Sequence, residues 1–173
     1  MKRLFCLILS ILLIVPVSGC QRQDRDTHYT FYYPRMDHGY NTLEGKFHNS
    51  FVEAESRKDI SGQSLFDILE IYLDGPIDLN LSNPFSKDLS VVSVSVNGQA
   101  LSIVVTDHLA ELTGIYLYIA CACLAQTGME LTNTDIVQIS CEKALLDGKK
   151  AISLGKDTIL FNDAATATTH EQE

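Results

Sequence analysis

The chain has 173 residues, 46% of them hydrophobic, and a formal net charge of −9 at pH 7. This length suits one domain with its own core. An acidic chain without a Lys/Arg cluster is not drawn to nucleic acid or to anionic lipid head groups, so we expect no nucleic-acid partner.

The N-terminus is typical of an export signal. Lys2 and Arg3 precede an apolar run from Leu4 to Val17. A spanning helix needs about 20 apolar residues to cross roughly 30 Å of hydrocarbon, and this run is shorter. We therefore expect residues 1–19 to be a cleaved signal peptide.

The segment that ends the apolar run, Val17-Ser18-Gly19-Cys20, resembles the lipobox of bacterial lipoproteins. The resemblance implies cleavage before Cys20, lipid attachment to Cys20, and a position on the outer face of the cytoplasmic membrane. Two or three acyl chains, each contributing about 0.8 kcal/mol per buried CH2, would hold the protein there. The alternative is an ordinary signal peptide whose cleavage site includes a cysteine. Residues 20–27 are charged and predict a flexible tether.

The first part of the body predicts two strands. His28 to Tyr33 is rich in β-prone aromatic residues and is stopped by Pro34. Residues 35–49 read as a polar loop. Phe51 to Arg57 alternates apolar and charged residues, as expected of a half-exposed strand.

Ser61 to Pro76 predicts an amphipathic helix. Its apolar positions recur at intervals of three and four residues: Leu65, Ile68, Leu69 and Tyr72. Ser61 or Ser64 can cap the helix, Gly75 lies just past its end, and Pro76 stops it.

The alternation of valine and serine in 91–97 predicts a strand, and a second strand returns over 101–105. Asn97-Gly98 between them favours a hairpin with a type I′ turn. One face of this hairpin is apolar, so we expect a helix to pack on it.

Asp107 to Thr127 predicts that helix, capped by Thr106 or Asp107 and ended by Gly128. It carries no charge from Gly114 to Ala125, which indicates a buried helix. This charge-free stretch spans only about 18 Å, which favours a core helix over a membrane span.

The remaining segments complete one α+β domain, residues 28–163. Ile136 to Ile139 predicts a strand beside the central hairpin, and a small hairpin is expected about Gly155-Lys156. Residues 164–173 are expected to be disordered. The predicted order is β-β-α-β-β-α-β plus a trailing β pair, a two-layer sandwich with two helices on one face of a mainly antiparallel sheet.

Three cysteines remain in the body: Cys121, Cys123 and Cys141. Cys121 and Cys123 point to different sides of a helix, which does not suit a zinc knuckle. We interpret all three as small buried hydrophobes. A disulfide from Cys141 to one of the others is the alternative in an exported protein.

No catalytic constellation stands out. Ser140 to Lys143 spells S-x-x-K, but it lies at a strand end, where positions three apart face opposite sides, and no S-D-N or K-T-G follows. Asp107 and His108 are adjacent and do not face each other on a helix. We therefore expect no enzymatic activity.

Metal and cofactor sites are not expected either. His28, His38 and His48 recur every ten residues, which is not a metal-ligand spacing. Glu53 and Glu55 share one strand face and could be paired carboxylates, but a solvated face is the commoner reading.

Three stretches together resemble the GerMN domain family, named for spore germination and sporulation lipoproteins. They are "SLFDILEIYLDGP" (Ser64–Pro76), "LSVVSVSVNGQALSIVVTD" followed by a second helix, and "TNTDIVQISCE". The first strand, with Tyr32-Tyr33, also fits the family's short aromatic run. The likeness covers Tyr29 to Phe161; where family members carry L-P-x-G-T ahead of the hairpin, this chain has "NPFSKDLS".

The resemblance implies a lipid-anchored extracytoplasmic binding or assembly module without catalytic residues. Its expected partners are envelope proteins or further copies of itself, and its expected role is in sporulation or germination. The interface would be a sheet edge or a helix face. An aromatic group, Tyr29, Phe31, Tyr32 and Tyr33, is a candidate, with core packing as the alternative. The alternative function is a solute- or glycan-binding envelope lipoprotein, which needs a pocket with convergent polar groups.

Overall fold

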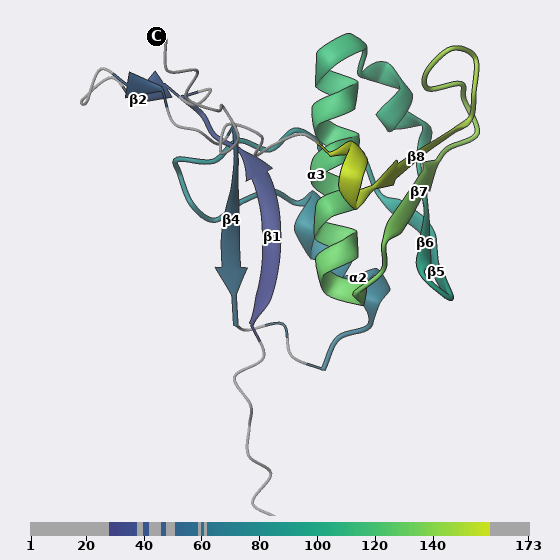
Figure 1. Ribbon diagram of the computed structural model, residues 1–173, viewed down its shortest axis with the longest axis horizontal. Coiled ribbons are helices and arrows are strands. Elements are labelled where there is room, and N and C mark those ends of the chain that lie inside the picture. The colour runs from purple at the N-terminus through teal and green to yellow at the C-terminus, as the bar shows by residue number, and fades with distance from the viewer. Residues whose placement is uncertain are drawn as a thin grey trace, which may run out of the picture.

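A computed structural model gives the fold (Figure 1) and describes residues 28–37, 40–41, 46–47, 51–58, 60 and 62–159. The expected leader (1–19), tether (20–27) and tail (164–173) lie outside the described residues.

The described strands form three sheets. β1 (Tyr29–Pro34) pairs antiparallel with β4 (Val52–Arg57), and between them the expected polar loop contains a short pair, β2 (Tyr40–Asn41) and β3 (Lys46–Phe47). The largest sheet has the order β5-β6-β7-β8. Its strands are β5 (Val91–Asn97), β6 (Ala100–Val105), β7 (Ile136–Ser140) and β8 (Ala151–Gly155). β6 and β7 run parallel, while the two outer pairings are antiparallel.

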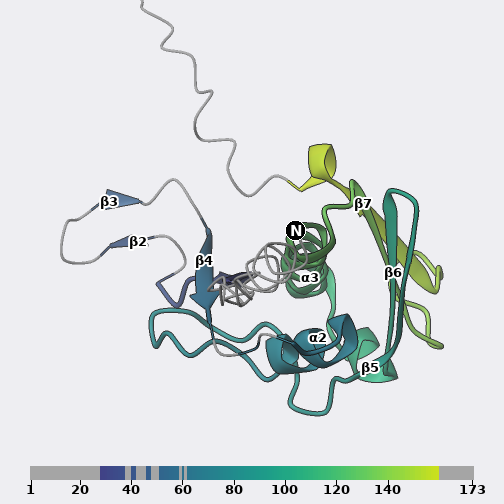
Figure 2. The ribbon, with the colours of Figure 1, turned by 90° about the horizontal axis from the view of Figure 1, so that it is seen from below.

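The predicted α+β class, with two helices against one face of a mainly antiparallel sheet, is confirmed. α2 (Leu65–Leu73) and α3 (Gly114–Thr132) lie on the same side of the four-stranded sheet (Figure 2). The β1–β4 pair does not join that sheet. It stands on the other side of α3, so α3 lies between two sheets (Figures 1 and 2).

α2 begins and ends as its sequence predicts. Ser64 is the N-cap, and its side chain and that of Asp67 form a reciprocal capping box. At the other end Asn83 Nδ2 donates a hydrogen bond to the Leu73 carbonyl, so the loop after the helix supplies the C-terminal partner. Leu69 and Tyr72 are fully buried on the inner side of the helix.

The central hairpin forms, but the prediction of its turn is wrong by one residue. Asn97 pairs with Ala100, so the two-residue loop is Gly98-Gln99. Gly98 has φ of +60°, and Gln99 is not among the residues with positive φ. Glycine at the first turn position alone fits a type II′ turn, not type I′.

The second helix also differs from its prediction. Asp107–Glu111 is a 3-10 turn, and α3 starts only at Gly114. Gly128 does not end α3, which continues to Thr132 and stops at Asn133 in the left-handed conformation. A Cβ at Gly128 would lie 2.7 Å from Leu101 Cδ2, so glycine here permits close approach of α3 to β6.

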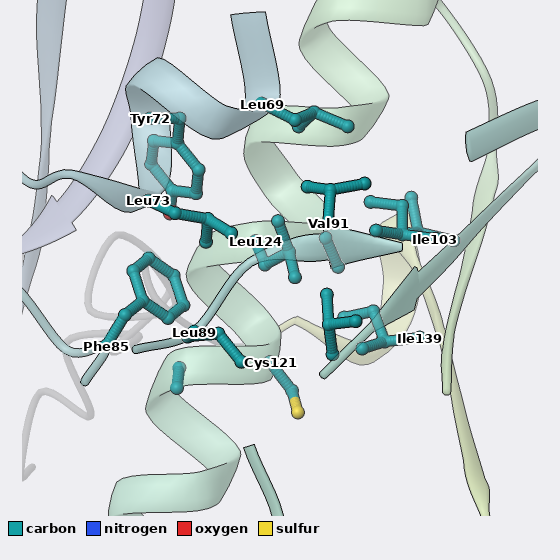
Figure 3. Packing of buried hydrophobic residues seen from close by; sticks show 14 of the residues in the cluster. Leu69, Tyr72, Leu73, Phe85, Leu89, Val91, Ile103, Cys121, Leu124 and Ile139 are labelled. Carbon is teal, nitrogen blue, oxygen red and sulfur yellow. The ribbon is translucent and has the colours of Figure 1, made fainter. Parts of the chain in front are cut away.

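α3 is the centre of the core, as its charge-free sequence predicts. By length and composition it is the one helix among the described residues that could cross a membrane, but 56% of that stretch is buried inside the domain. Leu124 and Cys121 meet Ile103 and Ile139 of the four-stranded sheet and the side chains of α2 (Figure 3).

The C-terminal hairpin predicted about Gly155-Lys156 is wrong. β8 pairs with β7 instead, and Lys156–Thr158 forms a 3-10 turn, here called η2. Gly155 N–H donates to Thr158 Oγ1 at 2.8 Å, and this local bond favours the turn over a second strand.

The close approach at Gly128 gives the first prediction. Gly128→Ala should lower the free energy of unfolding, because overpacking costs about 1–3 kcal/mol and exceeds the roughly 1 kcal/mol gained from helix propensity. In a Leu101→Val background the same substitution should cost at least about 0.5 kcal/mol less, since valine lacks the Cδ2 methyl that the new Cβ would contact. Urea unfolding of the four proteins measures this coupling, and additive costs would contradict the contact.

Candidate functional site

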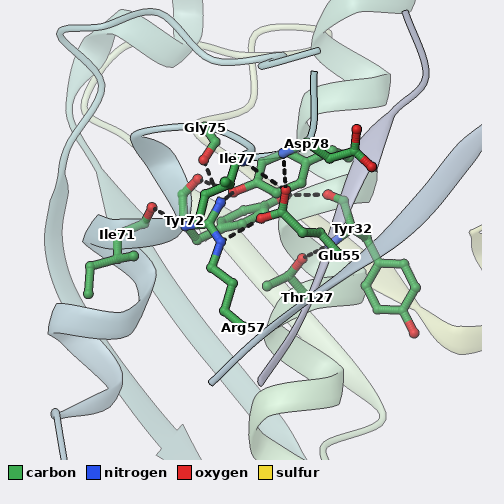
Figure 4. A network of polar contacts seen from close by, with 10 residues as sticks. Tyr32, Glu55, Arg57, Ile71, Tyr72, Gly75, Ile77, Asp78 and Thr127 are labelled. Atoms are coloured by element: carbon green, nitrogen blue, oxygen red, sulfur yellow. Dashed lines mark hydrogen bonds and ion pairs between the residues drawn. The ribbon is translucent and has the colours of Figure 1, made fainter. Parts of the chain in front are cut away.

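A buried pair of opposite charges lies on β4. Arg57 Nε donates to Glu55 Oε1 at 2.5 Å, and both side chains are only 9% exposed. Glu55 Oε2 accepts the backbone N–H groups of Ile77 and Asp78, each at 2.8 Å (Figure 4). Oε1 of Glu55 thus holds Arg57 of the same strand, and Oε2 fastens the loop after α2 to β4.

Arg57 links the same strand to α2 and to the aromatic core. Its Nη2 donates to the Gly75 carbonyl at 2.6 Å, and its guanidinium lies 4.9 Å from the centre of the Phe31 ring. Tyr33, also beside Arg57, donates its hydroxyl to the Tyr72 carbonyl at 2.7 Å. Burial chiefly raises the pKa of Tyr33, with the positive charge of Arg57 opposing it. We interpret this network as structural, because the polar groups of Glu55, Arg57 and Tyr33 bind other groups within the domain.

Both readings of Glu53 and Glu55 are therefore wrong for Glu55. Glu55 is neither solvated nor paired with a second carboxylate. Glu53 binds Arg35 instead, and its side chain is 50% exposed. On this one strand face, Glu55 thus lies in a buried part and Glu53 in an exposed part.

A polar cleft of about 380 Å³ lies between β1, the C-terminal part of α3 and η2. It is lined by Tyr32, Gln126, Met129, Glu130, Asn133, Lys156 and Ile159. The four lining residues of the α3 region fall at i, i+3, i+4 and i+7, which places them along one side of the helix. This is a pocket with convergent polar groups, which the sequence did not reveal.

Tyr32 has a fixed place in this cleft. Its N–H donates to Thr127 Oγ1 at 3.0 Å, and its carbonyl accepts from the Tyr72 hydroxyl at 2.9 Å. Its ring projects away from these bonds (Figure 4). Burial raises the pKa of the Tyr32 phenol, Glu130 raises it further, and a hydrogen bond with Gln126 lowers it. The phenol is therefore a neutral hydrogen-bonding group at physiological pH.

An apolar groove of about 390 Å³ lies where α3 begins. Its lining includes Pro34, Pro84, Leu112, Ile115, Tyr116 and Ile119. Ile115 is 62% exposed and Tyr116 is 70% exposed. These two side chains therefore form an exposed apolar edge of the groove.

β5 forms an open edge of the four-stranded sheet. The strand contains no charged residue and no proline. Val92 and Val96 are 58% and 50% exposed. Natural edge strands are usually protected by charge, by proline or by a bulge, and here only the irregularity between Val91 and Ser93 does so.

The cysteine interpretation is confirmed, and the alternative disulfide is not formed. Cys121, Cys123 and Cys141 are buried with free thiols. Burial is the main cause that raises the pKa of Cys121 to about 12, and it raises the pKa of Cys123 as well. A thiol in this state is inert, because the thiolate is the reactive form.

The other sequence candidates do not gather into a site. Ser140 ends β7, as predicted, and Lys143 lies in the following loop, where its N–H donates to Asp107 Oδ1. Asp107 therefore does not cap the helix as expected, and Thr106 makes no side-chain cap bond either; the N-cap of α3 is Thr113. His108 pairs with Glu111. Within the described residues no three His, Cys, Asp or Glu side chains group as metal ligands.

The structure describes some of the predicted histidines and aromatic residues, but not the predicted lipid site. His28 bonds Ser56, whereas His38, His48 and Cys20 lie outside the described residues. Two members of the aromatic group, Phe31 and Tyr33, are fully buried, which confirms core packing for them. Tyr29 and Tyr32 are half-buried.

Comparison with protein families, curated proteins and solved structures finds no match to this chain. The likeness to the GerMN family therefore rests on the sequence pattern described above.

The buried ion pair predicts unequal effects of one substitution at two neighbouring positions. Glu55→Gln should lower the free energy of unfolding by about 1.5–3 kcal/mol, because the amide replaces one of two acceptor oxygens that serve charged or backbone donors. Glu53→Gln, on the same strand face, should cost at most about 1 kcal/mol, since its pair with Arg35 is exposed. Urea unfolding of both variants measures the difference, and equal costs would show that Glu55 is not held as described.

Proposed function

We propose that this protein is a lipid-anchored module on the outer face of the cytoplasmic membrane that works through protein–protein contacts in the cell envelope. The lipobox-like segment at Cys20 supports the anchor, and the likeness to the GerMN family supports a role in sporulation or germination. The observation that carries the proposed contacts is the open, uncharged β5 edge. We propose that the partner of the β5 edge is a second copy of this chain.

The backbone of β5 is suited to pairing. Asn97 and Ala100 flank a two-residue loop and so form a hydrogen-bonded pair with each other. Hydrogen-bonded and non-bonded pairs alternate along an antiparallel ladder, which turns the N–H and C=O groups of Val94 and Val96 toward the open edge. The N–H of Val91, at the start of the strand, is taken by Glu70 of α2. The stretch available for pairing is thus the second half of the strand, which contains Val94 and Val96.

The side chains of β5 suit a second β5 in antiparallel orientation. Residues 92–96 read V-S-V-S-V, which is the same in both directions. In a two-fold pairing centred on Val94, valine faces valine and serine faces serine throughout residues 92–96. In a pairing centred on Ser95, Val94 faces Val96 and Ser95 faces its own copy, while Ser93 faces Asn97. The register centred on Ser95 opposes the outward backbone groups of Val94 to those of Val96, and the register centred on Val94 opposes the groups of Val94 to those of its own copy. A two-fold pairing of this kind is self-complementary and closed.

Cysteine crosslinking tests the pairing. Ser95→Cys, alone and combined with Ser93→Cys to cover both registers, should give a disulfide-linked dimer in intact cells, because opposed strand residues lie within disulfide reach. Ser153→Cys, an exposed serine on β8 at the other edge, is the matched control and should stay monomeric on non-reducing gels. Absence of dimer in both β5 variants, or equal dimer in the control, would overturn the pairing.

Charge at the same position should separate the copies. Ser95→Lys places like charges near the two-fold axis, so self-association should weaken by about fivefold, equivalent to about 1 kcal/mol. Higher salt should partly restore it, since surface charges are screened. Sedimentation analysis of the variant, with Ser153→Lys as control, measures both effects; an unchanged dimer fraction would speak against the β5 edge.

The lipid anchor has its own test. Cys20→Ser should abolish incorporation of a fatty-acid label, because the serine hydroxyl does not form the thioether that carries the lipid. Cys6→Ser, a matched change within the leader, should leave labelling intact. Label on the Cys20→Ser protein would show that the membrane attachment is made elsewhere.

A further inference from the structure

We propose that the polar cleft between β1, the end of α3 and η2 binds a neutral saccharide of about one to two rings. This goes beyond the proposed protein contacts and does not rest on them, because the cleft and the β5 edge share no residue. The cleft, of about 380 Å³, falls within the roughly 300–1,000 Å³ usual for small-molecule sites.

The cleft is held on rigid elements. Tyr32 is fixed through its backbone by Thr127 and Tyr72. Gln126 and Glu130 stand one turn apart on α3, whose core side is packed between the sheets. A third wall comes from η2, which is held by the bonds from Lys156 N–H to the Asp135 carbonyl at 3.3 Å and from Gly155 N–H to Thr158 Oγ1 at 2.8 Å. Preorganised walls of this kind lower the ordering cost of binding.

The charges of the cleft favour a neutral ligand. Glu130 is its one acidic lining residue and Lys156 its one basic lining residue. Lys156 forms an exposed pair with Asp135, so Glu130, Lys156 and Asp135 together leave no net positive charge to hold a phosphate or a carboxylate. A single exposed carboxylate beside an ammonium group gives little net attraction for a cation.

The polar groups are those that recognise hydroxyls. The amide of Asn133 offers two donors and one acceptor, and Gln126 and the phenol of Tyr32 bond each other and each keep further donor or acceptor capacity for a ligand. Met129 and Ile159 add apolar surface to the same cleft. A pyranose combines a rim of hydroxyls with a C–H face, and that face suits the electron-rich side of an aromatic ring. These features together select a sugar rather than a purely apolar or charged ligand.

Binding can be measured on the full chain in a zwitterionic detergent that carries no sugar head group. Cellobiose and N,N′-diacetylchitobiose are the probes, and titration calorimetry should give a dissociation constant of about 1 mM or tighter for at least one of them. Tyr32→Ala and Gln126→Ala should each weaken binding at least about tenfold. Tyr116→Ala and Gln138→Ala, exposed residues of the same types outside the cleft, should not change it.

Folding of each variant is checked by its thermal transition, and Tyr32→Phe, which keeps the ring, should retain most of the affinity. The proposal is overturned if neither disaccharide binds, or if binding is unchanged in both cleft variants. Displacement of the bound disaccharide by a neutral tripeptide of similar size would also overturn it, because the cleft would then recognise amides rather than sugar hydroxyls. None of these results depends on whether β5 pairs.

Discussion

The fold depends on the need to cover one helix on nearly every side. Every residue of α3 from Ala120 to Ala125 is buried, and a sheet can bury only one side of a helix. The four-stranded sheet covers one side, α2 covers a second, and the β1–β4 pair covers the side opposite the sheet (Figure 2). The hydrogen bond from Tyr32 N–H to Thr127 Oγ1 ties that pair directly to the helix. The domain is therefore organised around α3 and not around a single sheet.

The buried ion pair follows from this arrangement. A two-stranded sheet is marginal alone, so the covering layer needs further attachment to the rest of the domain. Arg57 and Glu55 supply it by binding the end of α2 and the loop behind it. With one partner removed, the other charge would remain buried and unpaired, which costs far more than the pair contributes. The same network positions β1, so it indirectly sets where Tyr32 meets α3.

Sequence patterns predicted the elements better than their boundaries and their neighbours. Alternation of valine and serine identified the central hairpin, but the turn moved by one residue because Asn97 is used in the ladder. Gly128 looked like a helix end, whereas its role is close contact with Leu101, which lies 27 positions away in the sequence. The polar cleft joins Tyr32 to Gln126 and Glu130, and no local pattern links residues so distant. Polar residues spaced along one side of an otherwise apolar helix were the only available signal.

The exposed valines of β5 are explained by the width of the helix layer. Leu101 and Ile103 on β6 are fully buried, while their partners Val96 and Val94 on β5 are 50% exposed and half-buried. The helices thus cover the middle of the sheet and leave its edge strand partly exposed. The residues of β5 on the helix-facing side, Val94 and Val96, are nevertheless valines. An edge that functioned alone would gain solubility from charge there. A lipid tether of the proposed kind holds copies in one plane and raises their effective concentration, so even a weak pairing of these edges would be populated.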